Sequence, residues 1–187
     1  MAATASQMIA LGAPAPAFSL PDVVSGKTLT PADVRGASAT LVLFICNHCP
    51  FVKHINGGLS ALARDYTAKG VGIVAISSND AEAYPADSPD NMKRVAAEEG
   101  YTFPYLYDET QEAARAYGAV CTPDIFLYDG ELRLVYRGQF DSSRPTNGLP
   151  VTGADVRAAL DALLAGGEVS PVQTPAIGCN IKWKRTA

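Results

Sequence analysis

The stretch Thr40-Leu-Val-Leu-Phe-Ile-Cys46-Asn-His-Cys49-Pro-Phe51 decides the fold of this chain. Residues 40–45 form a continuous apolar run of strand length, which predicts a buried central strand in a sheet covered on both faces. A helix should begin near Cys49-Pro50, because proline suits the first helical turn, where its missing N–H costs no hydrogen bond. Two cysteines are therefore expected where a buried strand ends and a helix begins.

Cys46 and Cys49 at this junction form a Cys-x-x-Cys motif. The two thiols lie one helical turn apart, close enough to form a disulfide with little backbone movement. The dipole and the free backbone N–H groups of a helix N-terminus stabilise a thiolate, which is the reactive form of cysteine. His48 lies between the two cysteines, and a protonated imidazole there would stabilise the thiolate and make the disulfide more oxidising. The alternative, an exposed His48 with no role, stays open.

The rest of the chain alternates strand and helix patterns. After the first helix, which Gly70 ends, we expect a strand at 71–76, a helix at 91–99, a strand at 103–107, a helix at 109–117, a hairpin at 125–136 and a helix at 153–164. This order predicts an α/β fold with a parallel sheet and an antiparallel edge.

Three segments lie outside this alternation. Residues 1–38 predict an N-terminal extension with a strand or hairpin around the turn at Ser25-Gly26. Residues 77–89 predict a polar loop, and residues 166–187 predict a loop-like C-terminal tail whose apolar residues dock on the domain. No boundary between domains is visible, so we expect one domain with a core at about 12–165.

Composition excludes several function classes. The chain has 187 residues and is 48% hydrophobic, which suits one compact domain. The charged fraction of 18% and the net charge of −4 favour neither nucleic acid nor an anionic membrane as a partner. The first ten residues do not resemble a signal peptide, and no segment approaches the ~18 apolar residues of a membrane span. We therefore expect a cytoplasmic protein, in which four cysteines favour redox or metal chemistry over structural disulfides.

Three segments carry a resemblance to a known family. Phe44–Phe51 resembles the active-site segment of the thioredoxin superfamily. Gly12–Leu20, followed by Gly26 and Leu29, resembles the lead-in of the peroxiredoxin and membrane-anchored thioredoxin-like branches. Cys121–Asp129 resembles the segment that carries the family's cis-proline. From about Gly12 to Leu164 the chain thus resembles a peroxiredoxin-like redoxin, related to alkyl hydroperoxide reductase and thiol-specific antioxidant, with a Cys-x-x-Cys motif.

The resemblance implies a thioredoxin-like fold, with a central mixed sheet flanked by helices, and an antioxidant thiol–disulfide oxidoreductase that needs no cofactor. It implies that Cys46 attacks and Cys49 resolves. It also implies that Pro123 is cis and lies against the motif, with Thr122 offering its backbone to an extended substrate. The implied partners are a protein or small-molecule disulfide or peroxide as substrate, and a thiol reductant such as thioredoxin or glutathione.

The chain departs from both branches. Thioredoxins usually have tryptophan before the motif and Gly-Pro inside it, where this chain has Ile45 and Asn47-His48. In the peroxiredoxin pattern Pro-x-x-x-Thr/Ser-x-x-Cys, Cys49 aligns with the attacking cysteine, Cys46 replaces the hydroxyl residue and Val42 replaces the proline. These losses weigh against efficient peroxide reduction.

The two remaining cysteines leave alternatives open. Cys121, two residues before Pro123, is a third redox partner, a metal ligand or a buried structural thiol. Cys179 is a distant resolving cysteine or a passive thiol, and the passive role is favoured.

Two other functions compete with dithiol exchange. The main alternative is a zinc or copper site built from Cys46, Cys49 and Cys121, with His48, His54 or Cys179 as fourth ligand. Against it, the second close pair of ligands usual in zinc sites is missing. A docking scaffold with vestigial cysteines is the other alternative, and the presence of both motif cysteines counts against it.

Overall fold

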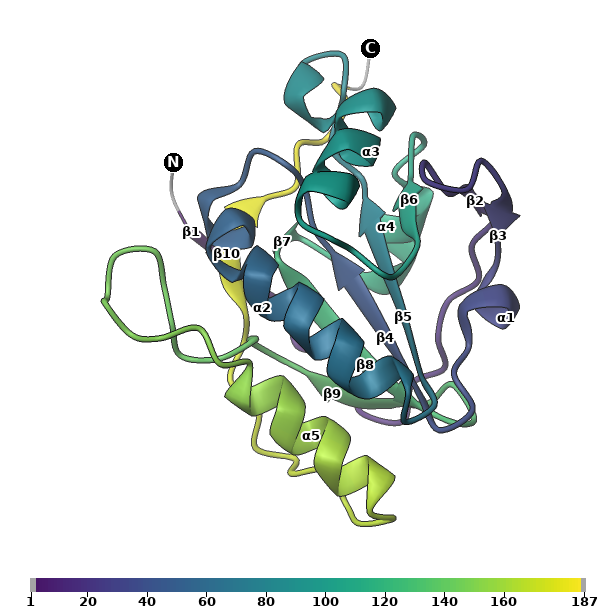
Figure 1. The fold of residues 1–187 in the computed structure, drawn as a ribbon, viewed down its shortest axis with the longest axis vertical. Helices are drawn as coiled ribbons and strands as arrows, with labels where there is room; N and C mark the ends of the chain where they lie inside the picture. The colour runs from purple at the N-terminus through teal and green to yellow at the C-terminus, as the bar shows by residue number, and fades with distance from the viewer. Residues whose placement is uncertain (1–2, 186–187) are drawn as a thin grey trace.

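A five-stranded mixed sheet forms the centre of the computed structural model, which describes residues 3–185 (Figure 1). The strand order is β6-β5-β4-β8-β9. β4 is parallel to β5 and β5 to β6, whereas β8 is antiparallel to both β4 and β9. The mixed sheet with an antiparallel edge is therefore confirmed. Its strands are β4 (Ala39–Phe44), β5 (Val71–Ser77), β6 (Tyr105–Tyr107), β8 (Asp124–Asp129) and β9 (Leu134–Arg137).

Strand β4 lies at the centre of this sheet, and all six of its residues are buried. Successive side chains of a strand point to opposite faces. Leu41 and Leu43 accordingly belong to one core cluster, whereas Val42 and Phe44 belong to another. The uninterrupted apolar run of β4 thus fills two cores at once.

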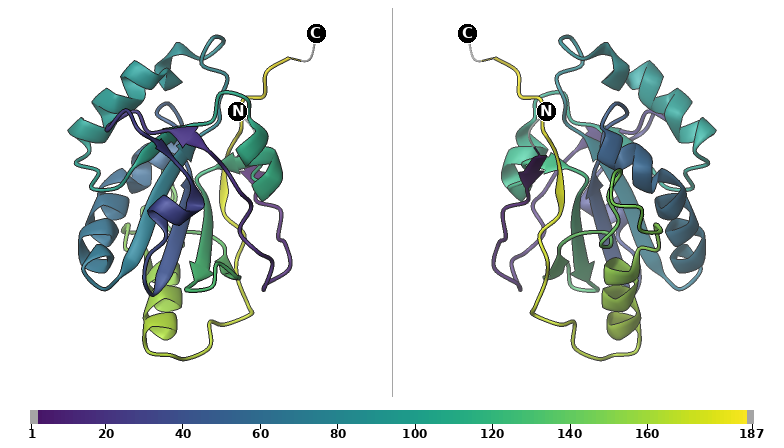
Figure 2. Two further views of the ribbon diagram at one scale, coloured as in Figure 1. Left: turned by 90° about the vertical axis from the view of Figure 1, so that its right-hand side faces the viewer. Right: turned by 90° about the vertical axis from the view of Figure 1, so that its left-hand side faces the viewer.

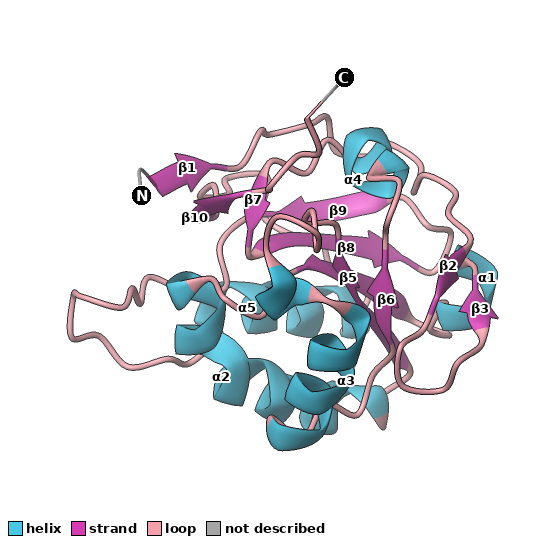
Figure 3. Cartoon of the chain, turned by 90° about the horizontal axis from the view of Figure 1, so that it is seen from above, coloured by secondary structure: helices cyan, strands magenta, loops and turns pink. Residues whose placement is uncertain are grey.

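Helices cover both faces of the sheet, as Figures 2 and 3 show. The first core cluster lies under α2 (Pro50–Thr67), α3 (Pro89–Glu98) and α5 (Ala154–Leu164), and the second lies under α4 (Glu112–Tyr117). The predicted helices are confirmed, with α2 beginning at Pro50 as expected. Two short elements were not predicted: the helical turn α1 (Pro31–Val34) and the 3-10 turn η1 (Pro85–Asp87).

Two smaller sheets involve the ends of the chain. β2 (Leu20–Pro21) and β3 (Thr28–Leu29) form the hairpin expected around Ser25-Gly26. The second small sheet has the order β1-β10-β7, formed by β1 (Ala3–Ala5), β10 (Ile177–Asn180) and β7 (Cys121–Thr122). The predicted extension and tail also include residues 1–2 and 186–187, which lie outside the described residues.

Strand β10 corrects the prediction of a loop-like tail at 166–187. The segment is too short and too rich in small residues to read as a strand by itself. It becomes one by pairing with β7 on one side and β1 on the other, and both partners are distant in sequence. The expected docking is confirmed, since Ile181 directly after β10 is only 1% exposed. Within residues 3–185, no helix is both long enough and apolar enough to cross a bilayer.

A buried ion pair joins the start of β8 to the end of β9. A guanidinium nitrogen of Arg137 lies 3.0 Å from a carboxylate oxygen of Asp124, and both side chains are fully buried. Arg137 also donates to the carbonyls of Tyr117 and Gly118. Burial raises the pKa of Asp124 to about 6, against the opposing effect of the Arg137 charge. Such a pair contributes little net stability, but loss of one partner leaves a buried charge without compensation.

Asp124→Ala should therefore lower the free energy of unfolding by roughly 3–5 kcal/mol, measured by urea denaturation. Glu98→Ala, which removes the exposed i,i+4 partner of Arg94, is the matched control and should cost no more than about 0.5 kcal/mol. Equal effects of the two substitutions would contradict the burial of the Arg137 pair.

Candidate active site

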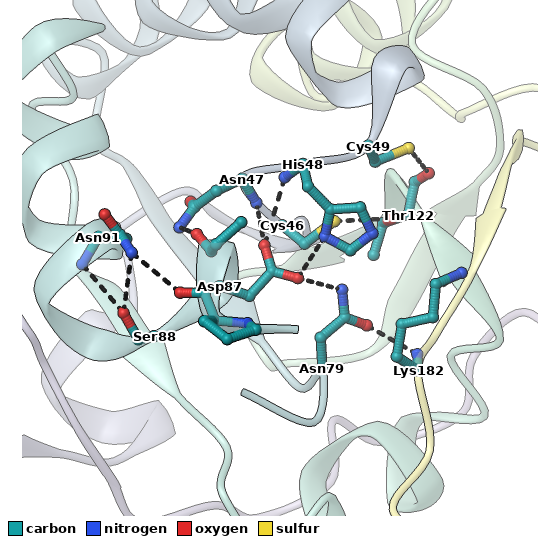
Figure 4. A network of polar contacts seen from close by, with 12 residues as sticks. Cys46, Asn47, His48, Cys49, Asn79, Asp87, Ser88, Asn91, Thr122 and Lys182 are labelled. Atoms are coloured by element: carbon teal, nitrogen blue, oxygen red, sulfur yellow. Dashed lines mark hydrogen bonds and ion pairs between the residues drawn. The ribbon is translucent and has the colours of Figure 1, made fainter. Parts of the chain in front are cut away.

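The two motif cysteines lie at the junction between β4 and α2, as predicted (Figure 4). Cys46 follows the strand and is 2% exposed, and Cys49 immediately precedes the helix and is fully buried. Both are free thiols. The junction therefore holds two reduced sulfurs at a helix N-terminus, shielded from solvent.

Thr122 contacts both sulfurs. Its hydroxyl lies 3.4 Å from Cys46 Sγ, and its carbonyl oxygen accepts a hydrogen bond from the Cys49 thiol at 3.2 Å. The peptide bond between Thr122 and Pro123 is cis, as the resemblance implies. The structure thus brings Cys46, Cys49 and Thr122 together, with Pro123 next in the chain.

His48 is held by a carboxylate that the sequence did not single out. Its Nδ1 lies 2.6 Å from Asp87 Oδ2, and its ring stacks on Tyr84 at a centroid distance of 5.4 Å. Its Nε2 is buried and has no hydrogen-bond partner among the described residues. His48 is therefore a fixed side chain with one ring nitrogen uncommitted, and the alternative of a freely exposed histidine is wrong.

Asp87 is fully buried and organises the loop around His48. Its Oδ1 accepts hydrogen bonds from the backbone N–H groups of Asn47 and His48 at 2.8 and 3.3 Å, and its Oδ2 accepts one from Asn79 at 2.8 Å. Burial raises the pKa of Asp87, but the bonds from His48, Asn79 and Asn47 outweigh burial and lower it. Asp87 therefore stays ionised beside the motif.

The sequence analysis missed Asp87 because it lies in the polar segment 77–89, which was predicted only as a loop. That segment holds two other acidic residues, Asp80 and Glu82, and no periodic pattern separates Asp87 from them. The one signal available in the sequence was Pro85, two residues before Asp87. In the structure both residues belong to the 3-10 turn η1, which precedes α3. Burial distinguishes it only once the fold is known.

The two sulfurs lie in different electrostatic surroundings. A hydrogen bond from the Cys46 thiol, together with donors from Cys179 and the Val52 N–H, outweighs burial and lowers the pKa of Cys49 to about 5. The same Cys46–Cys49 hydrogen bond, burial and the nearby Asp87 charge raise the pKa of Cys46 well above its usual range. The Thr122 carbonyl favours the protonated form of Cys49, but several donors oppose this single acceptor. The lowered pKa of Cys49 and the raised pKa of Cys46 therefore favour Cys49 as the thiolate of the pair.

The other two cysteines lie close to the motif. Cys121 is fully buried in β7 and its thiol faces the Pro123 carbonyl at 3.7 Å. Cys179 in β10 pairs with Thr122, so β10 occupies the backbone edge that the resemblance assigns to an extended substrate. The proposed role of Thr122 in substrate binding thus requires β10 to move aside.

One group of side chains could hold a metal ion. Ligand atoms of Cys46, His48 and Asp87 lie within 4.8 Å of one another. Within residues 3–185, no such group includes Cys121, so the predicted ligand set of Cys46, Cys49 and Cys121 does not come together. In the group that does, His48 Nδ1 and Asp87 Oδ2 already contact each other at 2.6 Å.

Comparison with protein families gives a clear result. The family described as "AhpC/TSA family" matches residues 11–137. The chain belongs to the AhpC/TSA family. Comparison with proteins of curated function gives no match.

Two solved structures are similar along nearly the whole of this AhpC/TSA chain. An uncharacterized conserved protein from Geobacillus kaustophilus is 59% identical, with 100% of this chain and 99% of that chain covered and a TM-score of 0.98. A hypothetical protein from Sinorhizobium meliloti is 51% identical, with 98% and 100% covered and a TM-score of 0.95. A putative thiol:disulfide interchange protein from Chlorobium tepidum is 20% identical, with 84% and 99% covered and a TM-score of 0.65. The thioredoxin-like fold is thus confirmed.

The thiolate should titrate at low pH. Ultraviolet thiolate absorbance should rise as the pH increases through about 5, because Cys49 loses its proton there. Cys46→Ala removes the largest cause of the lowered pKa and should move this transition to higher pH. Cys121→Ser is the control and should leave it in place. Persistence of the transition in Cys49→Ser would contradict the assignment.

Asp87 should stabilise the fold in a pH-dependent way. Its pKa is lower in the folded chain than in the unfolded one, so its contribution is present above about pH 4 and lost as the pH falls through the folded pKa. Asp87→Asn should cost roughly 1.5–3 kcal/mol at neutral pH. Urea denaturation at several pH values should show this difference shrinking in acid. The exposed neighbour Asp90 is the control, and a pH-independent difference for Asp87→Asn would contradict its ionised state.

Proposed function

We propose that this AhpC/TSA protein is a thiol–disulfide oxidoreductase that exchanges disulfides through Cys46-Asn47-His48-Cys49. One observation carries the proposal: Cys46 and Cys49 lie together at a helix N-terminus, both in contact with Thr122, and the pKa of Cys49 is lowered while that of Cys46 is raised. One sulfur is then ready to attack, and the other is a protonated thiol beside it. A thiolate with an adjacent thiol is what dithiol–disulfide exchange requires.

We assign the attack to Cys49, which reverses the order that the thioredoxin resemblance implies. Its thiolate attacks a substrate disulfide and forms a mixed disulfide, while one substrate thiolate leaves. Cys46 then attacks the Cys49 sulfur, releases the second substrate thiol and leaves a Cys46–Cys49 disulfide. The peroxiredoxin pattern agrees with this order, because it aligns Cys49 with the attacking cysteine.

Cys46 must lose its proton when it resolves the mixed disulfide. The high pKa of Cys46 means that a nearby base assists this step. A His48 ring nitrogen lies within 4.8 Å of Cys46 Sγ, and Asp87 holds the ring in place. His48 is therefore the proposed proton acceptor, with Asp87 as its positioning residue.

A disulfide is a better substrate for this site than a peroxide. None of the hydrogen bonds to either sulfur comes from an arginine within residues 3–185, and Arg137 is engaged with Asp124. A peroxide site would need such a cation and the hydroxyl that Cys46 replaces. The cycle closes when a thiol reductant such as thioredoxin or glutathione reduces the Cys46–Cys49 disulfide, which suits a reducing compartment such as the cytoplasm.

Equilibration with thiol redox buffers under metal-free conditions, read by intact mass, should show one two-electron transition. Its potential should lie above the roughly −270 mV of thioredoxin, because a stabilised thiolate favours the reduced form. Peptide mapping should link Cys46 to Cys49. Cys121→Ser should behave like the unsubstituted protein, and Cys49→Ser should lose the transition.

Two results would contradict this proposal. An undiminished transition in Cys49→Ser would place the redox chemistry elsewhere. A protein that forms no disulfide, and whose native mass includes a metal ion that Asp87→Asn loses, would favour a metal site at Cys46, His48 and Asp87.

A further inference from the structure

A third cysteine, Cys179, packs in the same core cluster as Cys49, although it is distant in sequence. Cys179 in β10 lies opposite Thr122 in β7, and the Thr122 carbonyl is the group that accepts the hydrogen bond from Cys49 at 3.2 Å. Each of the two cysteines also shifts the pKa of the other, since Cys179 lowers the pKa of Cys49 and Cys49 raises that of Cys179. Two cysteines therefore lie near Cys49, Cys46 on the same loop and Cys179 on β10, the strand beside β7 in Figure 1.

The position of Cys179 is fixed by packing on both sides. Its neighbour Gly178 lies so close to the Thr122 carbonyl that any Cβ there would collide with it. On the other side, β1 pairs with β10 and places Ala3 opposite Cys179. Cys179 is 4% exposed and lies in the same core cluster as Cys46 and Cys49. Cys179 is therefore held in a fixed position by its neighbours and does not lie on a free tail.

Cys121 does not share this arrangement, although it is just as buried and lies one residue before Thr122. Its thiol faces the carbonyl of Pro123 in its own segment. Cys121 is not among the groups that lower the pKa of Cys49, whereas Cys46 and Cys179 are. Cys121 therefore serves as the matched control for Cys179.

We propose that Cys179 is a second resolving cysteine, able to attack the Cys49 sulfur in place of Cys46. The step rests on the proposed function, which supplies the mixed disulfide between Cys49 and a substrate thiol. The Cys179 sulfur forms a bond to the Cys49 sulfur, the bond between Cys49 and the substrate sulfur breaks, and the substrate leaves as a thiol with the proton that Cys179 gives up. The substrate disulfide is reduced by two electrons and the two cysteines are oxidised by two, so no further oxidant is needed.

The two possible disulfides have different effects on the chain. A Cys46–Cys49 bond closes within the motif and leaves β10 free to separate from β7. A Cys49–Cys179 bond ties β10 to the start of α2 and holds the tail across the Thr122 edge. Oxidised Cys49 thus gives two forms of the protein. In one, β10 can separate from β7, and in the other a disulfide holds β10 against it.

The test uses Cys46→Ser and the aromatic disulfide DTNB, whose released thiolate is followed by absorbance. Attack by Cys49 releases one thiolate and leaves an adduct on Cys49, and resolution by Cys179 releases a second. We expect the adduct to clear, the mass to fall to that of the protein less two hydrogens, and peptide mapping under non-reducing conditions to link Cys49 with Cys179.

Double variants separate the roles. In Cys46→Ser/Cys179→Ser the adduct should persist, with its clearance slowed on the order of a hundredfold or more, because an intramolecular thiol acts at a high effective concentration. Cys46→Ser/Cys121→Ser should clear it as fast as Cys46→Ser alone. If Cys46→Ser fails to fold, the unsubstituted protein oxidised with limiting DTNB should contain a fraction with the Cys49–Cys179 link.

Each other outcome overturns the proposal. An adduct that persists in Cys46→Ser, clearance that survives loss of Cys179, a link from Cys49 to Cys121, or no Cys49–Cys179 link in the oxidised unsubstituted protein would each exclude Cys179 as a resolving thiol. If the unsubstituted protein still forms the Cys46–Cys49 disulfide, the proposed function stands. If Cys49→Ser forms the adduct as readily as the unsubstituted protein, the proposed function fails as well.

Discussion

The contact of Thr122 with both motif sulfurs is the interaction on which this site depends. The hydroxyl of Thr122 lies beside Cys46, its carbonyl beside Cys49, and its backbone pairs with Cys179. One residue therefore contacts the motif cysteines and pairs with Cys179, which is distant from them in sequence. The central sheet makes this contact possible. The motif follows the end of β4, and Thr122 in β7 lies just before the start of β8, the strand that pairs with β4.

Much of this arrangement could be predicted from local sequence. The apolar run at 40–45 and the proline at position 50 place a strand and a helix on either side of Cys46 and Cys49, and both predictions hold because they depend on periodicity and on the first helical turn. The cis bond before Pro123 came from the family resemblance, since an X–Pro bond without such context is rarely cis. The roles of Thr122 and of the individual cysteines stay predictions.

What the sequence did not reveal depends on contacts between distant segments. Asp87 is one acid among several in a polar loop, and only its burial against Asn47, His48 and Asn79 gives it a role. β10 has no strand pattern of its own, because its backbone hydrogen bonds go to β1 and β7. The same long-range contacts set the electrostatics, since Asp87 disfavours a thiolate at Cys46 and Cys179 helps to stabilise one at Cys49. The motif alone therefore suggests the roles of Cys46 and Cys49 only by analogy with relatives. The groups around each sulfur give the two cysteines different pKa values.

The tail beyond β10 is fastened to the same network. The backbone N–H of Lys182 donates to Asn79, whose amide donates to Asp87, and the side chain of Gln111 bonds to the Lys182 carbonyl and the Lys184 N–H. The order of these segments along the chain has a consequence for biosynthesis. A ribosome makes Cys46 and Cys49 well before Cys179, so the nascent chain carries its two motif thiols before the strand that covers them exists. Until the tail emerges, the pair lacks both the strand β10 and the Cys179 thiol that helps to lower the pKa of Cys49, so the surrounding medium must keep it reduced.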